Sequence, residues 1–307
     1  MITKPTTLLL GAGASAHLGY PVGYQLRDQI LAELKIQLCL PEDKRIPILR
    51  DGDSLIGFHT KMSRGGWTSP DAFLEKHTEF LQMGKFLIAY CLKRNEDPDR
   101  LFPATGWYEY LCQRLLAGAE TSEDFRRNDK LSIVTYNYDR SVDHFLHQLV
   151  LHRYELSSDV AWELLSSTIK IVHVHGILGS YPGYPYEVSQ DIEVISSLSN
   201  SIKIIHEVEP SHEAFSRASQ LLNSAEAVYS IGFSMSDTNM KRLSHFTDMS
   251  KEGRRIHGPG TFKCAMGDLS TLEIEEIANR LSVYNIHKSE LIAHLSGSFF
   301  RYIASLE

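Results

Sequence analysis

The chain has 307 residues, of which 43% are hydrophobic and 22% charged, values typical of a soluble globular protein with one large domain or two small ones. Its 31 Lys and Arg against 38 Asp and Glu leave a net charge of −7, so we expect no direct binding of nucleic acid. No apolar run reaches membrane-spanning length, and the first residues do not resemble a signal peptide, so we expect no membrane association.

The four cysteines are scattered along the chain and include no C-x-x-C pair: Cys39, Cys91, Cys112 and Cys264. This spacing favours reduced thiols over disulfides or a zinc ribbon. We therefore expect a cytoplasmic protein that binds no structural zinc.

The first thirty residues carry the strongest local signal. The apolar run Thr6–Leu10 leads into Gly11-Ala12-Gly13-Ala14-Ser15-Ala16, and a helical pattern follows from Tyr24 to Leu38. A strand, a glycine turn and a helix form the first unit of a dinucleotide-binding fold, in which glycines let the backbone approach a pyrophosphate. The hydroxyl of Ser15 could donate to a phosphate. The alternative is a tight turn with no ligand.

The next part of the chain departs from an ordinary dehydrogenase. The acidic residue expected about 20 residues after the glycines would be Glu33, but it falls inside the helical pattern. Residues 39–130 show no second strand. Their first part, 41–69, has the Gly and Pro content of a loop, and helices are predicted at 72–92 and 107–116. We interpret 39–130 as a helical insertion within a single domain of residues 1–307; a separate helical domain is the alternative.

Alternation of strands and helices then resumes. Apolar runs predict strands at 131–134, 169–172, 227–231 and 261–266, with helices between them, and the stretch 177–200 predicts a long loop. The order predicts an α/β fold with a Rossmann-like, doubly wound, mostly parallel sheet.

Polar side chains follow four of the predicted strands. They are Ser15 after the first, Asn137 and Asp139 after the second, His175 after the third, and Ser234 and Asp237 after the fourth. Ligands bind beyond the carboxyl ends of strands in open parallel sheets, so these residues should converge on one crevice.

In that order, the motifs Gly11-Ala12-Gly13-Ala14-Ser15, Thr135-Tyr136-Asn137-Tyr138-Asp139, His175-Gly176 and Gly232-Phe233-Ser234 resemble those of sirtuins. The chain lacks the paired cysteines of the zinc module in protein deacylases, and Gly19-Tyr20-Pro21 lacks the Asp-Phe-Arg usual there. It is more similar to the sirtuin-like domains of bacterial antiphage defence systems, which hydrolyse NAD.

The resemblance implies an NAD glycohydrolase with NAD as its substrate. It implies that Asn137 is catalytic, that Asp139 fixes the nicotinamide carboxamide, and that His175 accepts a proton from a ribose hydroxyl or water. The nucleotide would be bound by Gly11, Ala12, Gly13, Ala14, Ser15, Asp139, Gly232, Ser234 and Asp237. The resemblance also suggests activation through a homo-oligomer or through a partner such as a HerA-type ATPase or a short Argonaute.

Each assignment has a plainer alternative. Asn137 or Asp237 could cap the following helix, a common role for these residue types. His175 could be a core histidine, as could His173, which should share its face of the strand. Tyr181, Tyr184 and Tyr186 could cover the nucleotide or simply anchor their own loop. His144 and His147, together with the strand-tip histidines, could suggest a metal, but we expect none. At the level of function, the alternatives are a non-catalytic sensor of NAD or ADP-ribose and a protein deacylase.

Overall fold

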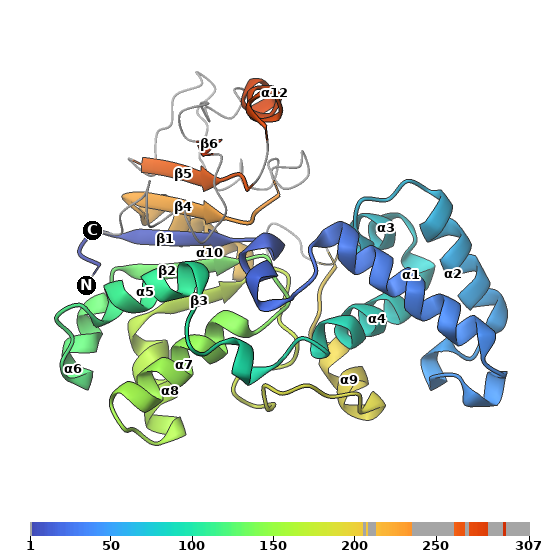
Figure 1. The fold of residues 1–307 in the computed structure, drawn as a ribbon, viewed down its shortest axis with the longest axis horizontal. Coiled ribbons are helices and arrows are strands. Elements are labelled where there is room, and N and C mark those ends of the chain that lie inside the picture. Colours follow the sequence, from blue (N-terminus) through green and yellow to red (C-terminus); the bar gives the residue numbers. More distant parts are fainter. Residues whose placement is uncertain are drawn as a thin grey trace.

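A parallel sheet organises the chain in the computed structural model, which describes residues 2–204, 207, 213–234, 261–267, 270–281 and 291–292. Within these ranges six strands pair in the order β3-β2-β1-β4-β5-β6, and every pair is parallel. This is the Rossmann-like arrangement, so the predicted fold class is confirmed (Figure 1). The strands are β1 (Thr6–Leu10), β2 (Leu131–Thr135), β3 (Lys170–His173), β4 (Ala227–Ile231), β5 (Thr261–Ala265) and β6 (Leu291–Ile292).

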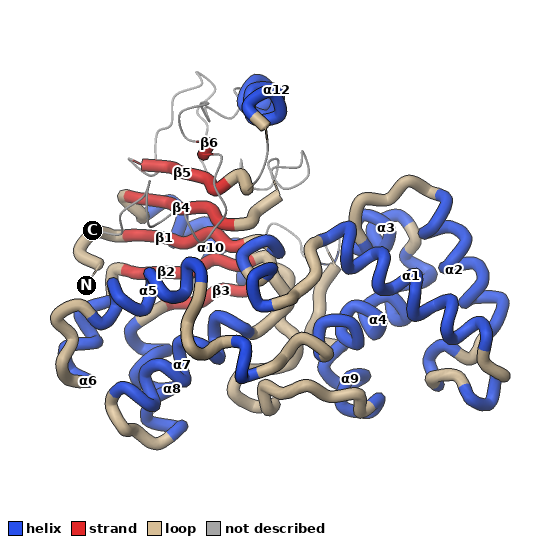
Figure 2. Tube along the Cα trace, in the orientation of Figure 1, coloured by secondary structure: helices blue, strands red, loops and turns tan. Residues whose placement is uncertain are grey.

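The sheet is covered on both faces, which explains why its strands are continuous apolar runs. Leu8 and Ile133 face the larger core cluster, which includes side chains of α7 (Ser141–Arg153) and α8 (Ser158–Thr168). Leu9 and Val134 face a second cluster with α10 (Glu213–Ser224). Figure 2 shows α7 and α8 on one side of the strands and α10 on the other.

A group of helices projects beside the sheet instead of covering it. We call α1 (Gly23–Cys39), α2 (Gly52–Arg64), α3 (Pro70–Lys76), α4 (Leu81–Lys93) and α9 (Ile192–Ser199) the helical group. The first four pack on one another, and α9 packs on α4 (Figure 1). The helix after the glycine turn, α1, therefore belongs to this group and does not cover the sheet.

The remaining helices between β1 and β2 return the chain to the sheet. They are α5 (Gly106–Leu116) and α6 (Ser122–Phe125), and α5 lies against the sheet in Figure 1. The last helix that the structure describes is α12 (Thr271–Leu281). Of the helices in the described ranges, none has both the length and the apolar content that crossing a membrane requires.

Three local predictions were wrong. The stretch 41–69 contains helix α2, because its buried face of Leu55, Phe58 and Met62 outweighs its glycines. The helix expected at 72–92 breaks at His77 into α3 and α4. The loop expected at 177–200 ends in α9, which begins where the Asp191 carboxylate accepts hydrogen bonds from the amides of Glu193 and Val194.

Candidate functional site

The carboxyl ends of three neighbouring strands lie level with one another. β1 pairs with β2 on one side and with β4 on the other, and Leu10 is in register with both Thr135 and Ile231. The residues that follow, including Gly11, Asn137 and Gly232, therefore start from the same edge. The chain order also reverses between β1 and β4, which is where open α/β sheets bind their ligands.

The glycine turn packs directly against the tip of β4. The amide of Gly11 donates to the carbonyl of Ile231 at 3.0 Å, and the amide of Gly13 donates to that of Gly232 at 3.0 Å. A Cβ at Gly11 would lie 2.5 Å from the Cα of Phe233, and one at Gly13 would lie 2.8 Å from the Cα of Gly232. The close backbone approach that we expected toward a pyrophosphate is made here to the neighbouring strand tip.

The segment after these glycines forms two short 3-10 turns, Ala12–Ala14 and Ala16–Leu18. The amides of Ala14 and Ser15 donate within the turn, to the carbonyls of Gly11 and Ala12. The backbone amides of Gly13, Ala14 and Ser15, which could have bound a phosphate, are thus all hydrogen-bonded within the chain. Helix α1 begins at Gly23, close to the predicted start at Tyr24, so no α-helix begins at the glycine turn itself.

The side chain of Asn137 is held in one orientation. Its Nδ2 donates to the carbonyl of Gly11 at 3.0 Å and to Oγ of Ser15 at 3.2 Å. A carbonyl only accepts, so the amide nitrogen must face Gly11. Both amide hydrogens are therefore committed, and Oδ1 is the atom that can accept from a ligand or a water. The side chain is nearly buried, with the residue 8% exposed.

Ser15 and Asp139 support that amide. Oγ of Ser15 donates to Oδ2 of Asp139 at 2.9 Å, so the proton that could have faced a phosphate is given to a carboxylate. The other oxygen, Oδ1, accepts from the amide of Ser141 at 3.0 Å and from its hydroxyl. Asp139 thus binds the first amide of α7. In the sequence analysis, capping of this helix was the alternative role for Asn137.

Two residues of α5 complete this cluster, and the sequence analysis did not identify them. Nε1 of Trp107 donates to the carbonyl of Ala14 at 2.9 Å, and the hydroxyl of Tyr108 lies 3.0 Å from Oγ of Ser141. Both rings are buried. The sequence placed Trp107 and Tyr108 in a predicted helix. It did not indicate that their polar atoms reach the residues that follow β1 and β2.

The two histidines at the end of β3, His173 and His175, lie in different surroundings, contrary to the prediction that they share a face. β3 ends at His173 and the chain turns there. His173 contacts Oδ2 of Asp143, on α7, at 2.9 Å. The ring of His175 instead packs edge-on against Tyr136, 5.1 Å between centroids, and against Phe215 of α10.

The surroundings of His173 favour its protonated form. Its Nδ1 lies 3.1 Å from the carbonyl of Asn137, which only accepts, and its Nε2 faces the Asp143 carboxylate. Burial lowers the pKa of His173, but the charge and hydrogen bond of Asp143, the hydrogen bond of the Asn137 carbonyl and the charge of Asp139 together outweigh burial, so the pKa is raised above its usual value. His173 therefore supports the backbone of Asn137.

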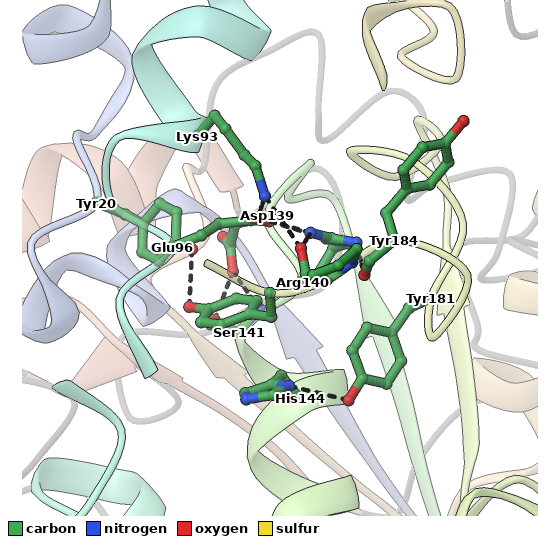
Figure 3. Close-up of polar contacts among 11 residues, drawn as sticks. Tyr20, Lys93, Glu96, Asp139, Arg140, Ser141, His144, Tyr181 and Tyr184 are labelled. Carbon is green, nitrogen blue, oxygen red and sulfur yellow. Dashed lines mark hydrogen bonds and ion pairs between the residues drawn. The ribbon is translucent and has the colours of Figure 1, made fainter. Parts of the chain in front are cut away.

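The residues 177–191, which we call the strap, are anchored by their tyrosines. The hydroxyl of Tyr181 lies 3.0 Å from Nδ1 of His144 (Figure 3). The same hydroxyl lies 2.7 Å from Nδ1 of His147. The hydroxyl of Tyr186 lies 2.8 Å from that of Tyr20, which follows the glycine turn. In the part of the chain that the structure describes, no three His, Cys, Asp or Glu side chains are grouped to hold a metal.

The structure thus brings Ser15, Asn137 and Asp139 together beside Gly11 and Gly232, and places His175 in an adjoining aromatic cluster. Ser234 is exposed just beyond β4, and Asp237 lies outside the described residues.

No protein-family model matches the chain, and a search of curated proteins finds no match.

Proposed function

We propose that the protein is an NAD+ glycohydrolase, which cleaves NAD+ to nicotinamide and ADP-ribose. The observation that carries the proposal is the oriented amide of Asn137 at the carboxyl edge of a sheet ordered 3-2-1-4-5, next to the reversal between β1 and β4. Dinucleotides bind at this edge in proteins with this strand order. The sequence resemblance to sirtuin-like NAD-hydrolysing domains of antiphage systems supports the same reaction.

The reaction breaks the bond between the ribose C1′ and the nicotinamide nitrogen. The bonding electrons leave with nicotinamide, which departs as a neutral molecule, and positive charge develops on the ribose. Water then adds to C1′ and loses a proton. Oriented dipoles near the sugar stabilise such a transition state, and they cost no reorganisation because they are already in place.

Asn137 supplies such a dipole. Its Oδ1 can accept from a ribose hydroxyl or from the attacking water, while Nδ2 is held by Gly11 and Ser15. Asp139 keeps Ser15 in place through a charge-assisted hydrogen bond. In this proposal, Asp139 and Ser15 position the amide, and Asn137 meets the substrate.

The proton released by water needs an acceptor, and an amide cannot take it. His175 is our candidate, because an imidazole exchanges protons near neutral pH. Its ring lies against Tyr136, the residue before Asn137. We further propose, from the resemblance, that a homo-oligomer or a partner such as a HerA-type ATPase or short Argonaute raises the activity.

A second candidate is a sensor that binds NAD or ADP-ribose without cleaving it. One observation favours it: the Ser15 hydroxyl and the Asp139 carboxylate are already bonded within the chain, as in a rigid binding surface. A protein deacylase is the third candidate, and the lack of the paired cysteines of the deacylase zinc module disfavours it.

The experiment combines binding and product analysis. Purified protein is titrated with NAD+ by calorimetry and incubated with NAD+, and nicotinamide and ADP-ribose are quantified. We expect both products in equal amounts from the wild type, and little or none from folded Asn137→Ala or His175→Ala. Binding without cleavage would identify the sensor, and release of an acyl group from an acetylated lysine peptide would identify a deacylase.

A further inference from the structure

Three charged side chains are buried together where the helical group meets the tip of β2. Arg140 binds Glu96 through two hydrogen bonds, from Nε at 2.8 Å and from Nη2 at 2.6 Å. Lys93, at the end of α4, binds the same carboxylate at 2.6 Å. Arg140 and Glu96 are fully buried, and 2% of the Lys93 side chain is exposed. Figure 3 shows both cations directed at Glu96.

Lys93, Glu96 and Arg140 carry two positive charges and one negative charge, and a further carboxylate, Asp139, lies next to Arg140 in the sequence. Asp139 precedes Arg140 in the chain and is nearly buried. Burial raises the pKa of the Tyr20 hydroxyl, and the negative charges of Asp139 and Glu96 raise it further, so both carboxylates act on the same region. Buried charges are tolerated when they are paired and hydrogen-bonded. We call Lys93, Glu96, Asp139 and Arg140 the charge quartet.

The same cations also hold the strap. Arg140 donates from Nη1 to the carbonyl of Tyr184 and from Nη2 to that of Pro185, each at 2.9 Å. Lys93 donates to the carbonyl of Pro185 at 3.0 Å. Two consecutive backbone carbonyls are therefore fixed by side chains from two distant parts of the chain.

We propose that the charge quartet is a positioning device for the candidate site. It ties the end of α4 and the strap to the residue that follows Asp139, and Asp139 in turn holds Ser15 and the amide of Asn137. Lys93, Glu96 and Arg140 are thus positioning residues that act through Asp139. The kinetic part of this inference rests on the proposed NAD+ cleavage, and the structural part does not.

A passive ion pair in a core is the competing explanation. Buried ion pairs are weak grounds for stability, since apolar residues of similar volume often serve as well. A positioning role differs because it predicts a local effect on the strap and on residues 136–141. If the role is positioning, breaking the charge quartet should loosen the strap and residues 136–141. A control variant with an equal loss of global stability should not loosen them.

The chain offers a matched control on the same helix. Lys93 and Lys85 both belong to α4, both side chains are nearly buried, and each binds a glutamate, Glu96 at 2.6 Å and Glu207 at 2.7 Å. Lys93→Met breaks the charge quartet, whereas Lys85→Met breaks a pair outside it. Amide hydrogen exchange is measured by mass spectrometry on the full chain, together with kcat and KM for NAD+ cleavage.

We expect Lys93→Met to raise exchange in the strap and in residues 136–141 at least tenfold, and to lower kcat at least tenfold while KM stays within threefold. Lys85→Met should change neither, even where global stability falls equally. The double variant Lys93→Met with Glu96→Gln removes one charge of each sign, so it should recover part of both losses.

Equal effects of Lys93→Met and Lys85→Met at equal stability would overturn the positioning role. If the wild type cleaves no NAD+, the proposed function fails, and the exchange measurement still decides: unchanged strap protection in folded Lys93→Met refutes the inference. Should Lys93→Met not fold, Arg140→Lys tests the same claim, since it keeps the charge but loses the two-pronged contact with Glu96.

Discussion

Ser15 donates its hydroxyl proton to Asp139 at 2.9 Å, and this bond joins the turn after β1 to the residues after β2. The two residues are 124 positions apart in the sequence. The bond leaves Ser15 Oγ as an acceptor for Asn137, so the orientation of that amide depends on both residues.

Ser15→Ala should therefore weaken catalysis without unfolding the protein. Loss of one supporting hydrogen bond is worth about 1 kcal/mol, which corresponds to about a fivefold fall in kcat. Ser199→Ala is the control, because Ser199 is also a buried serine, and its hydroxyl donates to the carbonyl of Ser196 in α9, away from the candidate site. Nicotinamide release should fall in the first variant and stay at the wild-type rate in the second. A Ser15→Ala enzyme with full activity would remove Ser15 from the support of Asn137.

Gly232→Ala should destabilise the contact between the tips of β1 and β4. Gly232 has φ +60°, and an added Cβ would lie 2.1 Å from the amide nitrogen of Ala14. Gly267 is a matched control, since its φ is +67° and nothing lies within 4 Å of an added Cβ. The left-handed backbone costs each variant about 1 kcal/mol, and the clash adds to it only at Gly232. Chemical denaturation should show a clearly larger loss for Gly232→Ala; equal losses would mean that the strand tips can separate freely.

The sequence predicted the sheet well, because strands covered on both faces are continuous apolar runs that need no partner to be recognised. The sequence predicted local structure poorly where packing against distant residues determines it. Helix α2 was missed because glycines obscured its buried face. His173 and His175 were placed on one face because the strand was assumed to continue beyond His173.

For the site, the strand order implied that residues after β1 and β2 meet, and the contacts of Ser15, Asn137 and Asp139 follow that logic. Arg140 and Glu96 could not be found in this way. A charged residue in a sequence gives no sign that it will be fully buried, and their pairing joins segments 44 positions apart.

The contact between His173 and Asp143 should make stability fall as the pH rises. The pKa of His173 is raised in the folded protein, so its contribution is fully present below the unfolded value of 6.5 and is lost as the pH rises through the folded value. The free energy of unfolding is measured by urea denaturation across this range, for the wild type and His173→Gln. The difference between them should shrink at alkaline pH; a constant difference would show that His173 is neutral in the fold.

His144 should produce the opposite trend. Burial, and then the positive charges of His147 and Arg140, lower the pKa of His144 to about 4. Between pH 6.5 and 4, His144 is protonated in the unfolded chain but stays neutral in the folded chain. The contribution of His144 to the free energy of unfolding is therefore present above pH 6.5 and is lost on acidification. His144→Gln should flatten the loss of stability in this window. If the variant and the wild type lose stability in parallel, His144 does not contribute to it.

A single-turnover reaction, with the protein in molar excess over NAD+, tests the proposed cleavage of NAD+. This design detects even a slow hydrolase whose activity is held low in the absence of a partner. The wild type should convert NAD+ to equal amounts of nicotinamide and ADP-ribose, and folded Asn137→Ala should leave NAD+ intact. NAD+ that survives the wild-type protein, or is cleaved equally fast by Asn137→Ala, would contradict this prediction.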